Sequence, residues 1–178
     1  MVTGDSTIQV AGRRAAAWGQ GYAILCFAGA LLSIGLLDLL TSVLLVLSTF
    51  LFVIVTRYSA RYMMGDAGQP RFTFWLSVTS TFVFALVLAE NLLSFAAAWC
   101  GISLSLHQLL QFYKDRPGAL LAARKKFLIS RVGDAALIAA LVLTQLTLGT
   151  WDFEGMFAAA EKLQAAPTAV GWIGWLLV

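Results

Sequence analysis

The chain has 178 residues, of which 60% are hydrophobic and only 12% are charged, with a formal net charge of +3. Soluble domains carry roughly 45–50% apolar and about 25% charged residues, and a chain of this length cannot bury so much apolar surface in an aqueous core. The composition excludes an ordinary soluble enzyme, a disordered tail and a nucleic-acid-binding domain. It predicts an all-α fold, a polytopic bundle of transmembrane helices.

Charge-free runs of about 20 residues, the length that crosses the hydrocarbon core, divide the chain. Residues 1–17 form a polar N-terminal segment that lacks the pattern of a signal peptide. We predict about five spans and the start of a sixth, near 18–34, 39–56, 72–89, 91–113, 119–148 and 168–178. The glycines in 18–34 also suit an interfacial or re-entrant segment. Because 168–178 is too short to cross a bilayer, we expect a piece of a longer protein or a partner that covers this end.

Basic residues concentrate in the loops 57–71 and 114–126, which alternation of the spans places on one side of the membrane. The connection 150–167 on the other side is mainly acidic, with Asp152, Glu154 and Glu161 against Lys162. Short cytoplasmic loops carry an excess of Lys and Arg. The pattern therefore predicts a multi-pass protein of the cell inner membrane with both basic loops in the cytoplasm.

Two successive spans each carry a polar stripe. The span 91–113 contains Cys100, Ser103, His107 and Gln111. Their spacing of three and four residues places them on one helical face. On the next span, Arg131 and Asp134 are three residues apart and can form an ion pair. If the two stripes face each other, they form an ionisable seam inside the membrane.

Ionisable residues inside spans are costly to bury and are functional candidates for that reason. His107 can pass a proton near neutral pH, so the sequence predicts a proton or ion relay through His107, Arg131 and Asp134. The alternative for these residues is helix packing, because small and polar side chains hold transmembrane helices together without moving anything.

Several other residues have simpler interpretations. Cys100 suits packing, and Lys125 and Lys126 suit a solvated or snorkelling helix end. Glu90 lies at the membrane edge, while Gly101 and Gly133 suit close helix contacts. The sequence has no phosphate loop, nucleophile elbow or metal-ligand spacing, so we expect neither an enzyme nor a cofactor or metal bound to this chain.

A set of short segments follows in a specific order along residues 38–157. They are DLLT (38–41), RYSARYMMGD (57–66), RF (71–72), LAENLL (88–93), QFYKDRPGA (111–119), KKFLISRVGD (125–134) and TWDF (150–153). This order resembles the antiporter-like subunit L family of proton-pumping NADH-quinone oxidoreductase.

The resemblance implies a many-helix membrane protein that moves protons or sodium along a line of charged residues. Lys125, Arg131 and Asp134 match the family's lysine, arginine and aspartate in one motif. Glu90 stands where the family has an acidic residue before Asn-Leu-Leu. Lys125 therefore joins the predicted relay, whereas Glu90 and Lys126 are weaker candidates. Cys100, Ser103 and Gln111 would form the supporting polar face.

The chain departs from the respiratory members at two positions. Trp99-Cys100 replaces the usual Trp-Glu, and His107 appears where those subunits have no histidine. The segments SLSLHQLL (103–110) and DRPGALLAARKKF (115–127) are similar to the B subunits of DAB-type inorganic-carbon transporters. These pair, as a hetero-oligomer, with a large, zinc-containing, carbonic-anhydrase-like A subunit at the cytoplasmic face.

That similarity implies uptake of bicarbonate or CO2 driven by protons or sodium, with zinc held by the partner. Two alternatives stay open: a subunit L or cation/proton antiporter subunit, and a truncated or assembly subunit that transports nothing.

Overall fold

The computed structural model describes residues 3–112, 117–162, Trp172 and Trp175. Within these residues it contains six helices and no strands: α1 (Thr3–Leu32), α2 (Leu39–Tyr62), α3 (Gln69–Val87), α4 (Leu92–Leu110), α5 (Pro117–Leu148) and α6 (Phe153–Lys162). The first five contain segments long and apolar enough to cross a membrane. The predicted fold, a polytopic transmembrane helix bundle, is confirmed.

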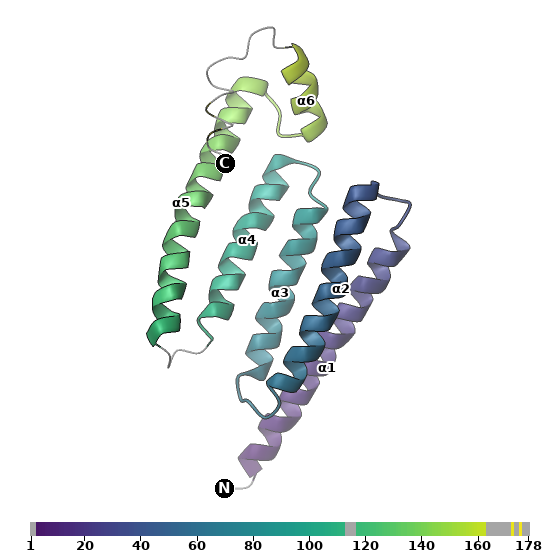
Figure 1. Cartoon of the computed structure of the whole chain (residues 1–178), viewed down its shortest axis with the longest axis vertical. Helices are drawn as coiled ribbons and strands as arrows, with labels where there is room; N and C mark the ends of the chain where they lie inside the picture. Colours follow the sequence, from purple (N-terminus) through teal and green to yellow (C-terminus); the bar gives the residue numbers. More distant parts are fainter. Residues whose placement is uncertain (1–2, 113–116, 163–171, 173–174, 176–178) are drawn as a thin grey trace.

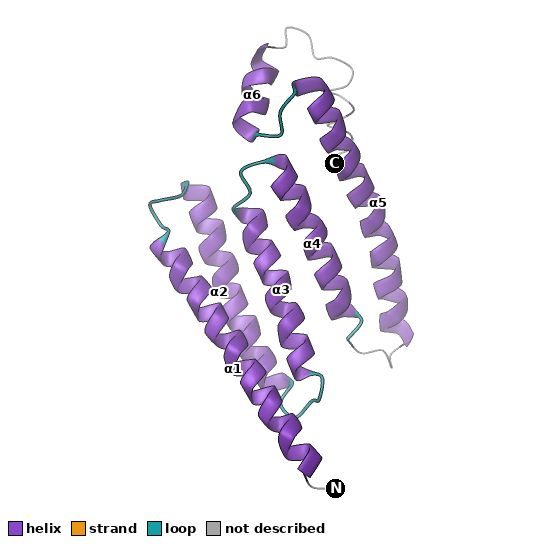
Figure 2. Cartoon of the chain, turned by 180° about the vertical axis from the view of Figure 1, so that it is seen from behind, coloured by secondary structure: helices purple, strands orange, loops and turns teal. Residues whose placement is uncertain are grey.

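The five long helices run up and down in chain order (Figure 1). α1, α2 and α3 pack against one another, α4 packs on α3, and α5 packs on α4. Figure 2 shows the same order from behind, with α5 at the edge farthest from α1 and α6 at the upper end of the bundle. The functional seam predicted between the fourth and fifth spans therefore corresponds to the α4–α5 contact.

Two helices extend beyond the predicted spans, because charge marks the membrane edge and does not end a helix. α1 begins at Thr3, so most of the segment predicted as a polar N-terminus is helical and continuous with the first span. α2 likewise runs past Arg57 and Arg61 to Tyr62. Arginine is a good helix former and its long side chain can reach the interface from inside a helix.

The remaining boundaries lie close to their predicted positions. α5 begins at Pro117, whose fixed φ suits the first turn of a helix. The segment 150–167 contains the short helix α6, and residues 163–167 lie outside those described. The predicted partial span 168–178 also lies outside the described residues apart from Trp172 and Trp175, so its helical state stays a prediction.

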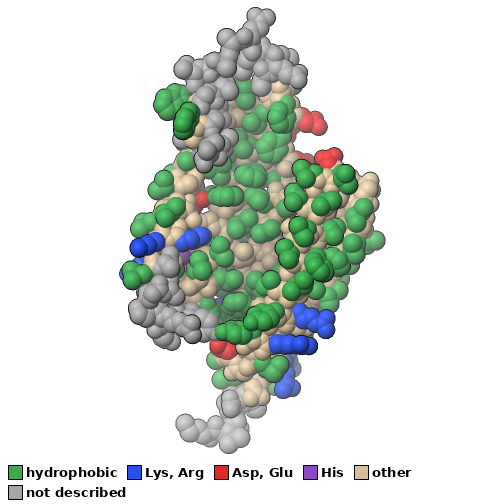
Figure 3. Space-filling view, in the orientation of Figure 1, with side chains coloured by type: hydrophobic (Ala, Val, Ile, Leu, Met, Phe, Trp, Pro, Cys, Tyr) green, Lys and Arg blue, Asp and Glu red, His purple; other side chains and the backbone are tan. Residues whose placement is uncertain are grey.

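The two ends of the bundle differ in charge. The α2–α3 loop, the end of α4 and the beginning of α5 lie at one end, with the α3–α4 loop and α6 at the other (Figure 1). Figure 3 shows Lys and Arg side chains in the half of the molecule towards the first end. The surface above them in this view is mostly apolar. The two basic loops thus share an end, as the alternation of spans predicts.

The main apolar core lies among α1, α2 and α3. It consists of Ala23, Ala30, Leu45, Phe52, Leu76 and Phe84. A second cluster joins α4 to α5 through Leu92, Ala96, Leu137 and Leu141. Because lipid tails are as apolar as these side chains, close packing rather than exclusion of water holds such helices together.

Gly101 illustrates this packing and supports a specific prediction. A Cβ at Gly101 would collide with the flank of the Phe82 ring on α3, whereas a Cβ at Gly133 on α5 meets nothing within 4 Å. The expected helix contact thus occurs at Gly101 and not, within the described chain, at Gly133. We expect Gly101→Ala to lower the free energy of unfolding by about 1–3 kcal/mol, measured by denaturation in mixed micelles.

Gly133→Ala is the matched control, because it makes the same chemical change on an open helix surface. It should be neutral or stabilise the protein by up to about 1 kcal/mol through helix propensity. Equal effects of the two substitutions would contradict the packing argument.

Candidate functional site

Ser103 is the point at which the charged side chains of α5 reach α4. Its hydroxyl oxygen accepts a hydrogen bond from Nη2 of Arg131 at 3.2 Å. Its backbone carbonyl accepts another from Nζ of Lys126 at 3.3 Å. Ser103 itself is buried. The two predicted polar stripes therefore face each other, as the spacing of their residues suggests.

His107 lies one turn further along α4 and stacks on Phe127 of α5. The centroids of the two rings are 4.4 Å apart and their planes are inclined by 33°. The guanidinium carbon of Arg131 lies 5.1 Å from the centroid of the same Phe127 ring. Phe127 thus contacts both predicted relay residues, and an aromatic ring attracts a nearby cation.

Arg131 and Asp134 form an ion pair within α5. Nη2 of Arg131 is 2.5 Å from Oδ2 of Asp134, and Asp134 is only 5% exposed. Neither carboxylate oxygen has a partner that meets hydrogen-bond geometry among the described residues. An ionised carboxylate can accept about four hydrogen bonds, so Asp134 keeps most of its acceptor capacity. Such a group can receive a proton or hold a cation.

His107 has unused hydrogen-bonding capacity as well. Its Nδ1 is buried and makes no hydrogen bond to any described residue. A neutral imidazole carries one donor and one acceptor nitrogen, so this atom is free to give or receive a proton. His107 and Arg131 both contact Phe127, and Arg131 is paired with Asp134, so the three residues form one connected group with an open position at each end.

Of the two adjacent lysines on α5, the structure places Lys126 and not Lys125 at the contact with α4. Lys125, which the family motif favours, is exposed, whereas Lys126 reaches Ser103 across the helix contact. Adjacent residues on a helix point about 100° apart, so only one of the two can face α4. Lys126 is therefore the lysine at the seam, and the role of Lys125 remains a prediction.

The remaining predicted residues lie around this group without joining it. Cys100 is half-buried on α4, and the half-buried Gln111 ends the helix, where its backbone N–H donates to the carbonyl of His107 at 3.1 Å. Glu90 is exposed in the α3–α4 loop. Phe127 is the residue that sequence reasoning missed. It precedes Arg131 by four residues, a spacing that places two side chains on one helix face.

The end of the seam opposite the basic loops is tied by backbone pairing. The N–H of Leu92 donates to the carbonyl of Trp151 at 2.8 Å, and Asn91 pairs with Asp152 as an isolated antiparallel bridge. The side chain of Asn91 also caps α4 by accepting from the N–H of Ser94 at 2.7 Å. These contacts fix the start of α4 relative to the end of α5.

Comparison with known proteins gives two family matches. Residues 89–178 match the transmembrane family of NADH:quinone oxidoreductase and Mrp antiporters. Residues 32–73 match the N-terminal family of NADH-ubiquinone oxidoreductase (complex I) chain 5. The first match includes α4, α5 and the whole polar seam.

Individual relatives carry two kinds of name. The chain is 38% identical over 139 residues to the probable inorganic carbon transporter subunit DabB2 of Halothiobacillus neapolitanus, which covers 78% of this chain and 25% of the relative. It is 38% identical over 116 residues to the probable inorganic carbon transporter subunit DabB of Hydrogenovibrio crunogenus, covering 65% of this chain and 22% of the relative. It is 36% identical over 115 residues to NADH-quinone oxidoreductase subunit L of Mycobacterium tuberculosis, covering 64% and 18%.

The chain thus spans a quarter or less of the length of these relatives. The match over residues 89–178 takes in about half of the chain, including the helices that form the seam. The chain belongs to the NADH:quinone oxidoreductase/Mrp antiporter family of membrane proteins.

Proposed function

We propose that this chain forms part of the membrane subunit of an inorganic-carbon transporter, in which an ion gradient drives uptake of bicarbonate or CO2. The observation that carries the proposal is the group formed by His107, Arg131 and Asp134 at the α4–α5 contact. The names of the two relatives with 38% identity support the same substrate class. In this proposal the chain is a transport subunit and not an enzyme.

The seam suggests how an ion could be coupled to transport. Asp134 gains or loses a proton or cation while Arg131 balances its charge. His107 exchanges a proton through its free Nδ1. A change of charge on Arg131 alters the electrostatic energy of Asp134, its ion-pair partner, and that of His107, which contacts the same Phe127 ring. One elementary charge crossing a potential of 100 mV supplies about 2.3 kcal/mol.

The partner in this proposal is a large, zinc-containing, carbonic-anhydrase-like subunit that binds the basic, cytoplasmic end. The zinc belongs to that partner, so this chain carries no cofactor of its own. An excess of Lys and Arg in the loops at one end of the bundle supports this orientation in the inner membrane. Hydration of CO2 would be catalysed by the partner.

A second candidate, a proton-pumping subunit L, is favoured by the match of residues 32–73 to complex I chain 5 and by the relative from Mycobacterium tuberculosis. The seam serves proton movement in either case. The two candidates differ in the proteins with which the chain assembles.

The experiment that tests the proposal is capture of the complete protein from its native membrane in mild detergent. Intact mass and zinc content of the complex are then measured, with an unrelated tagged membrane protein as the control. A large zinc-containing partner is the expected result. Respiratory subunits with flavin and iron–sulfur centres would replace the proposal with the second candidate. Recovery of the protein alone would contradict both and favour an assembly or non-transporting subunit.

A further inference from the structure

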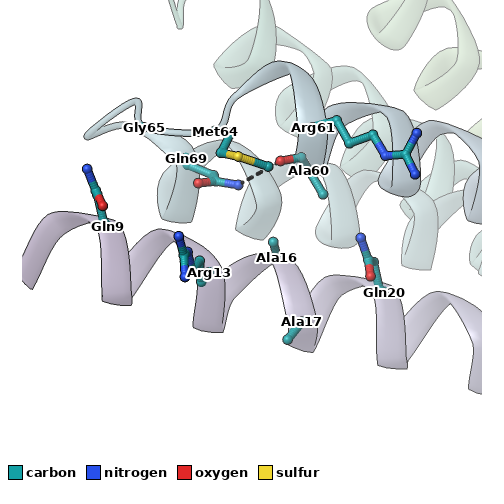
Figure 4. Close-up of a pocket in the computed structure, with 10 residues that line it drawn as sticks. All are labelled: Gln9, Arg13, Ala16, Ala17, Gln20, Ala60, Arg61, Met64, Gly65 and Gln69. Carbon is teal, nitrogen blue, oxygen red and sulfur yellow. Dashed lines mark hydrogen bonds between the residues drawn. The ribbon is translucent and has the colours of Figure 1, made fainter. Parts of the chain in front are cut away.

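A cavity of about 500 Å³ lies between α1, α2 and the beginning of α3, away from the α4–α5 seam. Its volume is within the range of about 300–1,000 Å³ found for small-molecule sites. Figure 4 shows Gln9, Arg13 and Gln20 projecting from α1 towards the segment that contains Arg61 and Gln69. Among the described residues, no acidic side chain lines this cavity.

One face of α1 supplies most of the polar groups. Gln9, Arg13 and Gln20 are separated by four and seven residues, which places them on the same helical face. Ala16 and Ala17 lie between Arg13 and Gln20 and leave space beside the longer side chains.

The opposite wall is held in place by Gln69. This residue is 4% exposed, and its Nε2 donates to the carbonyl of Ala60 at 3.3 Å, which joins α3 to α2. On the other side, a Cβ at Gly12 would lie 2.5 Å from Oε1 of Gln69, so glycine lets α1 approach without displacing this side chain. The cavity is therefore built by fixed contacts among three helices.

Arg13 of α1 and Arg61 of α2 both line this cavity, and neither forms an ion pair with a described residue. A guanidinium presents a planar fork of donors that matches a phosphate group, and glutamine amides add neutral donors. Among the described lining residues, no carboxylate competes for these cations. The chemistry favours a phosphate anion.

The membrane depth of the cavity indicates where that phosphate comes from. Tyr58 and Tyr62 stack on α2 with ring centroids 5.9 Å apart and are both exposed, as expected at a membrane interface. The cavity lies at this level, because Ala60 and Arg61 are in the same turn of α2. Towards the bilayer centre, Leu51 and Ile54 of α2 and Leu25 of α1 are exposed apolar side chains that suit acyl chains.

We propose that the cavity lined by Arg13 and Arg61 binds the phosphate head group of an anionic glycerophospholipid. Basic pockets between transmembrane helices on the cytoplasmic side are suited to such head groups. The bound lipid would join α1 to α2 at the end of the bundle that carries the basic loops. This site is separate from the relay residues and does not depend on the proposed transport function.

The test measures binding of phosphatidylglycerol to the purified full chain in neutral detergent, by titration and by native mass spectrometry. The variant Arg13→Gln/Arg61→Gln is compared with Arg14→Gln/Arg71→Gln. Both remove two positive charges, but Arg14 and Arg71 are exposed residues outside the cavity lining. We expect one tightly bound lipid in the wild type, at least a tenfold weaker affinity in the first variant, and a change of less than threefold in the second.

Two further arms identify the source of the phosphate. Phosphatidylcholine should not compete, and inorganic phosphate at millimolar concentration should not displace the lipid. The variant Arg13→Lys/Arg61→Lys, which keeps the charges without the guanidinium forks, should bind with intermediate affinity. If Arg13→Gln/Arg61→Gln fails to fold, this lysine variant takes its place in the comparison with Arg14→Gln/Arg71→Gln.

Several results would overturn the proposal. Equal losses in the two glutamine variants would indicate a diffuse basic surface. Equal binding of phosphatidylcholine would indicate an apolar groove, and displacement by inorganic phosphate would indicate a soluble anion. Lack of any bound phosphatidylglycerol would reject the site altogether.

Discussion

Replacing His107 by alanine in the complete protein should abolish growth that depends on inorganic-carbon uptake, while the protein remains in the membrane at its normal level. The substitution removes the buried Nδ1 and the stack on Phe127. Histidine is the side chain that ordinarily titrates near neutral pH, and the described residues at the α4–α5 contact include no second histidine. No side chain there would therefore take over proton transfer from His107. Growth at atmospheric CO2 and immunoblots of isolated membranes provide the two measurements.

His107→Phe separates proton transfer from packing, because phenylalanine keeps an aromatic ring against Phe127 and removes both nitrogens. A relay role requires that His107→Phe also abolish growth. Normal growth of His107→Phe, with loss in His107→Ala, would show that the ring matters only for packing. Wild-type growth of both variants would reject the relay role and favour a non-transporting subunit.

Replacing Arg131 by leucine should lower the free energy of unfolding by about 3–5 kcal/mol, the cost of leaving a buried charge without its partner. Asp134 is 5% exposed, and Arg131 is its ion-pair partner at 2.5 Å. The loss also removes the hydrogen bond from Nη2 to Ser103. Denaturation of the purified protein in mixed micelles measures the change.

The double variant Arg131→Leu/Asp134→Leu should recover most of that stability, to within about 1 kcal/mol of the wild type, because no unpaired charge remains. It should nevertheless be as inactive as the single variant if the pair takes part in ion movement. Recovery of activity together with stability would show that the pair is structural. Equal destabilisation by the single and double variants would show that the ion pair does not account for the effect.

The sequence predicted the helical membrane fold and the contact between the two polar stripes. Both follow from periodicity: long apolar runs have the length of a bilayer, and residues three or four positions apart share a helix face. The pairing of Arg131 with Asp134 and the contact of Ser103 with α5 are consequences of that spacing. Local rules suffice here because each partner lies on the same or the next helix.

Other features depend on the rotation and tilt of helices, which hydropathy does not contain. The choice of Lys126 over Lys125 depends on which side of α5 faces α4. The position of Phe127 between His107 and Arg131 depends on the same rotation. The helix α1 continues through Arg13 and Arg14, which the predicted span excludes. Charged residues indicate where a segment leaves the membrane, but they do not indicate where its helix ends. The cavity at Arg13 and Arg61 depends on how α1 crosses α3 at Gly12.

The ion pair within α5 has a consequence for how the protein enters the membrane. Each unpaired charge at the centre of a nascent helix adds about 2.5–3.5 kcal/mol to the cost of its release from the translocon. Arg131 and Asp134 are three residues apart, so they neutralise each other as soon as α5 becomes helical. This neutralisation requires no other helix to be in place. α5 can therefore partition into the bilayer as an independent segment during synthesis, before it meets α4.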